Sequence, residues 1–112
     1  MSDKATAIFA KRLKEARAMR DVSQRALGAK IGMTKQAGST RVNRYEQQTS
    51  RADMDTAAAL AEALGVPLAY LFAHDRGMAD WILAYDAFSQ EQRDSILSLA
   101  ASKPASDPTA SD

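Results

Sequence analysis

The chain has 112 residues, a length that suits one domain with a short appended element, and apolar residues make up 46% of it. It contains no cysteine and one histidine, His74, so disulfides, thiolate metal sites and histidine-based metal sites are excluded. No apolar run approaches the length of a membrane span, and the N-terminus lacks the basic-then-apolar pattern of a secretory signal. We therefore expect a cytoplasmic protein with no membrane segment and no cofactor.

The net charge of +1 conceals an uneven distribution of charge along the chain. Residues 1–53 carry 12 Lys and Arg against 5 Asp and Glu, whereas residues 54–112 carry 3 against 9. A basic half suggests a polyanionic partner, but basic residues also commonly solvate helix faces. Composition alone leaves these two interpretations open.

Residues 5–19 are predicted to form a first helix, because apolar residues recur there with helical spacing. Its apolar face carries Phe9, Leu13 and Ala16. Ser23 is a predicted cap for a second helix that begins at Gln24 and ends at Gly32. Glycine inside a helix costs roughly 1 kcal/mol against alanine, so Gly28 indicates the close approach of another helix.

Residues 34–48 hold hydroxyls, amides and three basic residues, but few apolar side chains. Val42 and Tyr45 lie three residues apart and are expected to share the inward face of a third helix. Asp53 is a predicted cap for a fourth helix that ends at Gly65. The inner face of that fourth helix carries Ala57, Leu60, Ala61 and Leu64.

Pro67 suits the first turn of a short fifth helix, because its missing N–H would be unpaired there anyway. The residues expected to dock this helix are Leu68, Leu71 and Phe72. After the linker AHDRG (73–77), apolar residues recur with helical spacing at Trp81, Tyr85 and Phe88. We expect these three side chains to serve in packing. Ser89 and Gln92 form a predicted capping box that begins a last helix. Its apolar side carries Ile96, Leu97 and Ala100.

The order and spacing of these features resemble a known family. The stretches that carry the resemblance are RLKEARAMRDVSQRALGAKIGM, VNRYE and LAEALGVPLAYLF. Two short helices joined by a glycine turn among further helices are typical of a helix-turn-helix. Over about residues 8–72 the chain resembles the Cro/C1-type (XRE-like) helix-turn-helix family of transcriptional regulators.

The resemblance implies an all-α fold for the matched region, and the chain as a whole divides into three expected parts. The first is a five-helix, lambda-repressor-like DNA-binding domain at residues 5–73. A C-terminal extension of one or two helices follows at residues 78–102. Residues 103–112 are polar and contain proline, and we expect them to be a disordered tail.

The third helix departs from the family pattern near its start. About four residues usually separate the hydroxyl residue that caps this helix from its first buried aliphatic residue, whereas Thr34 and Val42 lie eight apart. The extra residues amount to about one helical turn. Either Thr34 caps a helix lengthened by one turn, or residues 35–37 lengthen the preceding loop and the helix starts near Gly38 and Ser39. Gly38 argues against the first alternative and Thr34 against the second, and the sequence leaves both open.

In a helix-turn-helix the second helix of the motif enters the major groove and presents its N-terminal side chains to base edges. Val42 and Tyr45 must then face the protein. The residues left toward the groove are Ser39, Thr40, Asn43 and Arg44, with Arg41 at its margin. Hydroxyls can pair with several base edges, Asn suits adenine, and Arg suits guanine. We expect Lys35 and Gln36 to contact phosphate.

The resemblance implies further roles outside this helix. Gln24 matches the family position that hydrogen-bonds a backbone phosphate, at a helix start that favours anions. Arg51 lies in a segment that resembles the family's other backbone-contacting region. Arg17 and Glu46 match positions that form a buried ion pair in some relatives, although such pairs contribute variably to stability.

The sequence leaves two uses open for the C-terminal helices, which can fold back on the same domain or pair with a second copy. A homodimer would contact half-sites about one helical turn apart. We predict a sequence-specific double-stranded DNA-binding transcriptional regulator, a dimeric repressor that uses its third helix in the major groove. The alternative is an antitoxin-like or protein-interaction module that uses the same fold to bind a protein partner. No catalytic set of residues and no self-cleaving peptidase domain is visible, so we predict no enzyme activity.

Overall fold

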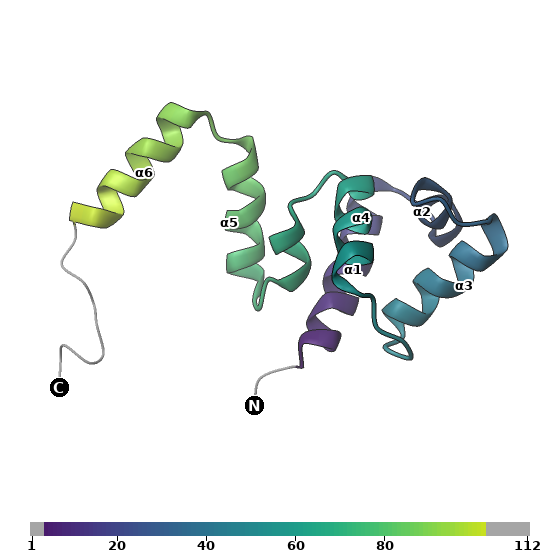
Figure 1. The fold of residues 1–112 in the computed structure, drawn as a ribbon. Coiled ribbons are helices and arrows are strands. Elements are labelled where there is room, and N and C mark those ends of the chain that lie inside the picture. The colour runs from purple at the N-terminus through teal and green to yellow at the C-terminus, as the bar shows by residue number, and fades with distance from the viewer. Residues whose placement is uncertain (1–3, 103–112) are drawn as a thin grey trace.

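The computed structural model describes residues 4–102, and this part of the chain contains helices and no strand (Figure 1). Its elements are α1 (Ala5–Arg20), α2 (Gln24–Lys30), α3 (Lys35–Glu46), α4 (Met54–Leu64), the 3-10 helix η1 (Leu68–Phe72), α5 (Arg76–Ala87) and α6 (Gln90–Ser102). The elements α1 to η1 form a body, from which α5 and α6 extend as an arm (Figure 1). The all-α fold is therefore confirmed. The predicted disordered tail, 103–112, lies outside the described residues.

Side-chain caps fix where several helices begin. Ser23 accepts a hydrogen bond of 3.0 Å from a backbone N–H in the first turn of α2, as predicted. Asp53 accepts one of 2.7 Å from the N–H of Thr56, and hydrogen bonding from this residue holds the pKa of the Asp53 carboxyl below its ordinary value. Ser89 and Gln92 exchange hydrogen bonds of 2.8 and 3.1 Å in the predicted capping box.

A single apolar core lies between α1, α2, α3, α4 and η1. Its fully buried side chains include Leu13, Leu27, Val42, Leu60 and Leu71. Burial of a large aliphatic side chain contributes roughly 1.5–3 kcal/mol relative to exposure, so this core fixes both motif helices on α1 and α4. Phe9 closes one edge, with its ring centroid 6.4 Å from that of Tyr45 and 5.7 Å from that of Phe72.

The helices α2 and α3 touch backbone to backbone at two glycines. A Cβ added to Gly28 would lie 2.4 Å from the Cα of Gly38, and one added to Gly38 would lie 2.7 Å from the Cα of Gly28. Gly28 therefore marks the close approach of another helix, as predicted. The helix α3 runs unbroken from Lys35, and Thr34 accepts a hydrogen bond of 3.3 Å from the N–H of Ala37. Of the two alternatives, the structure has the helix lengthened by one turn.

The element η1 buries a different set of residues from the one predicted. Tyr70 and Leu71 are buried, whereas Leu68 and Phe72 are 41% and 47% exposed. The prediction that Leu68 docks this element was wrong. The sequence pattern could not separate Leu68 from Tyr70, because both side chains are apolar enough to be buried.

A polar cluster joins the arm to the body. Arg12 is only 2% exposed, and it donates hydrogen bonds to Glu15 (2.8 Å) and to the carbonyl oxygen of Ala73 (3.0 Å). Arg76 donates to the same Glu15 carboxylate at 2.8 Å. Ala79 of α5 is buried against the body. Because α5 already begins at Arg76, the connection is shorter than the predicted linker.

Most large apolar side chains of the arm face outward. Trp81 and Tyr85 are 61% and 55% exposed, and no residue of α6 is buried. Their expected packing role is therefore not met within the described part of the chain, which leaves pairing with a second copy open, whereas Phe88 is half-buried. Helical spacing predicts an amphipathic helix, but it does not say what covers the apolar face. Among the described residues, no helix has the length and apolarity needed to cross a membrane.

Candidate nucleic-acid interface

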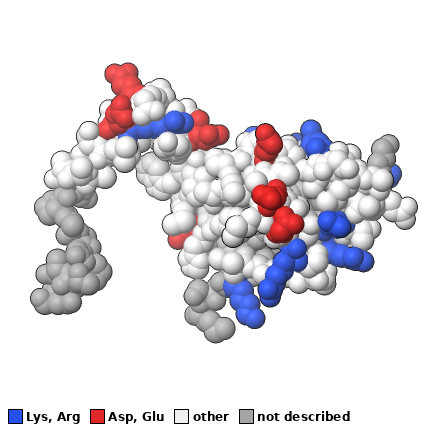
Figure 2. All heavy atoms as spheres, in the orientation of Figure 1, with Lys and Arg blue, Asp and Glu red and all other residues white. Residues whose placement is uncertain are grey.

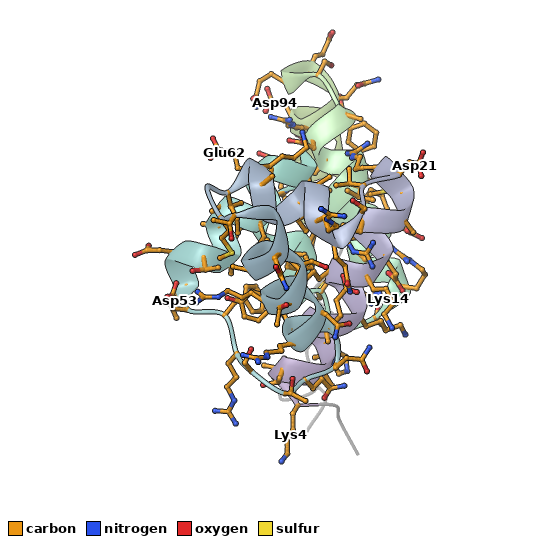
Figure 3. The ribbon with its side chains drawn as sticks, turned by 90° about the vertical axis from the view of Figure 1, so that its right-hand side faces the viewer. Lys4, Lys14, Asp21, Asp53, Glu62 and Asp94 are labelled. Atoms are coloured by element: carbon orange, nitrogen blue, oxygen red, sulfur yellow. The ribbon has the colours of Figure 1, made fainter. Side chains whose placement is uncertain are left out.

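The helix α3 turns one face to the core and the other to solvent. Its buried residues are Gly38, Val42, Tyr45 and Glu46. The opposite face carries exposed side chains at positions i, i+4 and i+8, namely Gln36, Thr40 and Arg44. We refer to these three residues as the polar stripe. Figure 3 views the molecule from this side, with α2 and α3 toward the viewer.

The other residues predicted for the groove lie around the polar stripe. Asn43 and Arg41 are exposed at its two edges. Ser39 is half-buried, because a step of one residue turns the helix by about 100° and places it between the exposed face and α2. Arg51 is exposed in the loop after α3, and Lys35 is the first residue of the helix.

A hydrogen-bonded network fastens α1, α2 and α3 together behind this face. Arg17 donates two hydrogen bonds, of 2.6 and 2.8 Å, to the carboxylate of Glu46, whose side chain is 1% exposed. The hydrogen bond with Glu46 raises the pKa of Arg17 above its ordinary value and outweighs the effect of burial. The ion pair that the sequence suggested is thus present, and it anchors the C-terminal end of α3.

Gln24 belongs to the same network. Its Nε2 donates to Glu46 Oε1 at 3.1 Å and to Asn43 Oδ1 at 3.2 Å. Gln24 was predicted to contact a DNA phosphate, but its amide nitrogen is hydrogen-bonded within the protein. In this arrangement Gln24 fixes the orientation of the exposed Asn43 side chain.

Two open hollows share Gln36 and Thr40. One, of about 460 Å³, is lined by Thr34, Gln36, Ala37, Thr40, Arg41 and Arg44. The other, of about 350 Å³, is lined by Arg25, Gln36, Ser39 and Thr40. Arg25 was missed by the sequence reasoning, since nothing marks it except its place next to Gln24. Guanidinium, amide and hydroxyl groups are the donors that contact phosphates and base edges in protein–DNA complexes.

Positive charge gathers at the same end of the molecule. Figure 2 shows Lys and Arg over the part of the body that carries α3 and the following loop, whereas the arm carries mostly Asp and Glu. In Figure 3 three labelled acids of the body lie around the α2–α3 face, namely Asp21, Asp53 and Glu62, whereas Asp94 belongs to α6 of the arm behind it. A cationic surface with acids at its edge attracts a polyanion.

Known proteins share this architecture. The helix-turn-helix family model matches residues 13–71, more than half of the chain. The crystal structure of the transcriptional regulator BswR is similar, with a TM-score of 0.78 and 32% sequence identity. This similarity covers 84% of this chain and 93% of that chain. Residues 1–75, which include the whole body, make up only about two thirds of this chain, so the similarity must also include part of the arm. No curated protein sequence matches the chain.

The family match begins within α1 and ends within η1, so it includes both helices of the motif and the face described above. The similarity to the solved regulator reaches into the arm as well. The chain belongs to the Cro/C1-type (XRE-like) helix-turn-helix family of DNA-binding transcriptional regulators.

Proposed function

We propose that this protein binds double-stranded DNA sequence-specifically, with α3 in the major groove, and represses transcription by occupying an operator. The observation that carries the proposal is the exposed polar stripe on a helix whose opposite face is fixed in the core. The major groove admits an α-helix, and polar side chains held at fixed positions on it can exchange water for base edges.

Each side chain has a role that follows from its chemistry. Arg44 suits the O6 and N7 edge of guanine, Asn43 suits adenine, and the Thr40 hydroxyl can pair with several bases. Ser39 supplies a second hydroxyl at the margin. The cations that contact phosphate are Lys35, Arg41 and Arg51. Gln24 orients Asn43, and it reaches phosphate only by exchanging one of its present hydrogen bonds.

The test is a selection of bound duplexes from a random pool, followed by affinity measurements on the selected site and on single-base variants. Arg44→Ala should cost roughly 1–3 kcal/mol at the preferred site and relax selectivity at one position. Gln90→Ala, an exposed residue of α6 in the arm, serves as the control and should leave both the affinity and the selectivity unchanged. A uniform loss across all duplexes would make Arg44 a phosphate contact, and no selection at all would overturn the proposal.

The second part of the proposal is that two copies bind together through the arm. The exposed apolar side chains of the arm are Met78, Trp81, Tyr85, Leu97 and Leu99. Three of them, Met78, Trp81 and Tyr85, recur at i, i+3 and i+7 and therefore share one exposed face of α5. Aromatic residues and Met are enriched at protein–protein interfaces, so this face of α5 suits contact with another chain.

The lack of buried residues in α6 also favours pairing with a second copy of the chain. It has 13 residues and buries none of them, and isolated helices of this length are only marginally stable in water. A second copy suits this surface better than a different protein, because one α3 contacts only a few base pairs and two copies contact two half-sites. The rival reading is an antitoxin-like or protein-interaction module that covers the arm with another protein.

Mass measurement in solution separates these possibilities. The wild type should have twice the mass of one chain, and Trp81→Ala combined with Leu97→Ala should have the mass of one chain. Both side chains are exposed within the chain, so the variant should keep its fold. A wild type that stays monomeric at high concentration would overturn the homodimer. Repression is tested separately by placing the selected site over a promoter and measuring transcription. Transcription should fall when the protein is present.

A further inference from the structure

The first turn of α3 is held in place at both of its ends. Thr34 caps it, and Gly38 at its end rests directly on Gly28 of α2. This backbone contact leaves no room for a side chain between the two helices. The added turn therefore has a fixed place, and the side chains on its outer side have fixed starting points.

Gln36 lies on the outer side of this turn, at the head of the polar stripe. It is exposed, one helical turn before Thr40 and two turns before Arg44. It also lines both hollows of the face, together with Thr40. Gln36 therefore lies between the two hollows and close to Thr40, whereas the sequence placed it among the phosphate contacts.

We propose that Gln36 contacts a base, with adenine as its preferred partner, and that Arg25 binds the phosphate beside it. The proposal deepens the function proposed above and rests on it. A Gln amide offers one donor and one acceptor, which match the N6 and N7 groups of adenine in the major groove. Gln36, which lies on the added turn, thus becomes a fourth base contact beside Thr40, Asn43 and Arg44.

The length of the polar stripe sets where the contacted bases lie. Gln36 and Arg44 are eight residues apart, which corresponds to about 12 Å along a helix at 1.5 Å per residue. Base pairs follow one another at about 3.4 Å along the duplex axis, and a helix in the major groove is inclined to that axis, so the bases contacted by these two residues should lie at most about four base pairs apart. Thr40 should contact a base between them.

Arg25 supplies the neighbouring cation. It is exposed on α2, and it lines the smaller hollow with Gln36, Ser39 and Thr40. Within the described residues it takes part in no ion pair, in contrast to Arg12, Arg17 and Arg76. Its guanidinium is therefore available for an anion at the side of the stripe. A flexible side chain at this place suits a phosphate, which gives affinity without base preference.

The experiment compares full-length variants on the duplex selected by the wild type and on its single-base variants. Gln36→Ala should weaken binding to the selected duplex roughly 5- to 150-fold and abolish preference at one A·T position. That position should differ from the one relaxed by Arg44→Ala and lie within about four base pairs of it. Arg25→Ala should weaken all duplexes equally and reduce the salt slope by about 0.9 per chain. Gln90→Ala, on α6, is the matched control and should change nothing.

The outcomes distinguish this proposal from the one on which it rests. If Gln36→Ala weakens every duplex equally, or has no effect, while Arg44→Ala still relaxes its own position, only the role of Gln36 falls. If the wild type selects no duplex, both proposals fall. Circular dichroism and thermal melts of each variant exclude loss of folding, which is not expected because Gln36 and Arg25 are exposed.

Discussion

Glu46 holds its charge almost out of reach of water, since its side chain is 1% exposed against 20% for Arg17. Two hydrogen bonds from Arg17 and one from Gln24 satisfy the carboxylate. Breaking a buried pair by removing one partner costs about 3–5 kcal/mol, because the other charge is left uncompensated. Arg17 is partly exposed, so we expect Arg17→Met to lower the free energy of unfolding in urea by roughly 2–4 kcal/mol.

A double variant checks the cause of that loss. Arg17→Met combined with Glu46→Leu removes both charges and should recover most of the lost stability. If it unfolds as easily as the single variant, the stranded carboxylate is not responsible. DNA binding should be weaker than wild type in the double variant, because Glu46→Leu removes the carboxylate that helps to hold Gln24 beside Asn43.

The acid sensitivity of the fold should depend on Glu15, which accepts hydrogen bonds of 2.8 Å from both Arg12 and Arg76. Burial alone would raise the pKa of Glu15, but the hydrogen bonds and charges of the two arginines outweigh it and hold the pKa below its ordinary value of 4.5. A carboxyl with a depressed folded-state pKa stabilises the fold above its unfolded-state pKa, and this contribution is lost as pH falls through the folded-state pKa. As the pH is lowered from 7 to 3, the melting temperature should therefore fall more steeply for the wild type than for Glu15→Gln. Parallel curves would show that Glu15 has the same pKa folded and unfolded.

At the scale of elements, helix propensity and packing act in opposite directions at Gly38. Alanine is favoured over glycine in a helix by about 1 kcal/mol. The Cβ of an alanine at this position, however, would lie 2.7 Å from the Cα of Gly28. Overpacking of this kind typically costs about 2 kcal/mol, the middle of a range of roughly 1–3 kcal/mol. We expect Gly38→Ala to lower the free energy of unfolding by about 1 kcal/mol and to weaken specific DNA binding, because α3 must move away from α2.

Gly77→Ala is the matched control for that variant, measured in the same denaturation and DNA-binding assays. A Cβ at Gly77 would meet only a side-chain oxygen of Asp75 at 3.3 Å, and Gly77 lies in α5 away from the DNA face. This change should be neutral or slightly stabilising, without effect on DNA binding. A Gly38→Ala protein more stable than the wild type would show that the two helices can separate at little cost.

Local signals made the body of this fold predictable. Ser23, Asp53 and Gly65 act within one turn of their own helices, so their sequence neighbours are enough to locate the helix ends. Gly38 could not be interpreted in this way. Its reason for being in a helix is Gly28, which lies on another element, and propensity alone made the same residue an argument for a loop.

The candidate site shows the same division between local and tertiary information. Val42 and Tyr45 fixed the phase of α3, and this phase places Thr40, Asn43 and Arg44 outward. The side chains of α2 depend on how the two helices cross. The sequence therefore missed Arg25, although it suggested the ion pair of Glu46 through the family resemblance. For the same reason, spacing alone could not show that Trp81 would be left uncovered by its own chain.

Over the whole molecule, the fold separates surfaces of opposite charge. The basic face lies over α3 and the loop after it, whereas the arm carries mostly acids (Figure 2). Phosphates attract the first surface and repel the second. An arm with acidic side chains around its apolar residues is therefore kept off the duplex and stays available for a second chain. The charge asymmetry of the sequence thus suits both DNA binding and the proposed pairing of two chains.

The dependence of DNA affinity on salt should report both of these functions. The logarithm of the binding constant falls with the logarithm of the salt concentration, with a slope of about −0.9 for each phosphate neutralised. Two chains held together through their arms neutralise twice as many phosphates as one. We therefore expect Trp81→Ala combined with Leu97→Ala to bind with about half the slope of the wild type, as measured by fluorescence anisotropy on the full operator over a series of salt concentrations.

A half-site duplex supplies the control for that measurement. On it the wild type and the double variant should show the same slope, because only one α3 is engaged in either case. If the double variant keeps the wild-type slope on the full operator, the arm does not bring two chains together, and the pairing surface must be sought on the body. If the wild type has the half-site slope on the full operator, one chain binds alone and its arm is free for another partner.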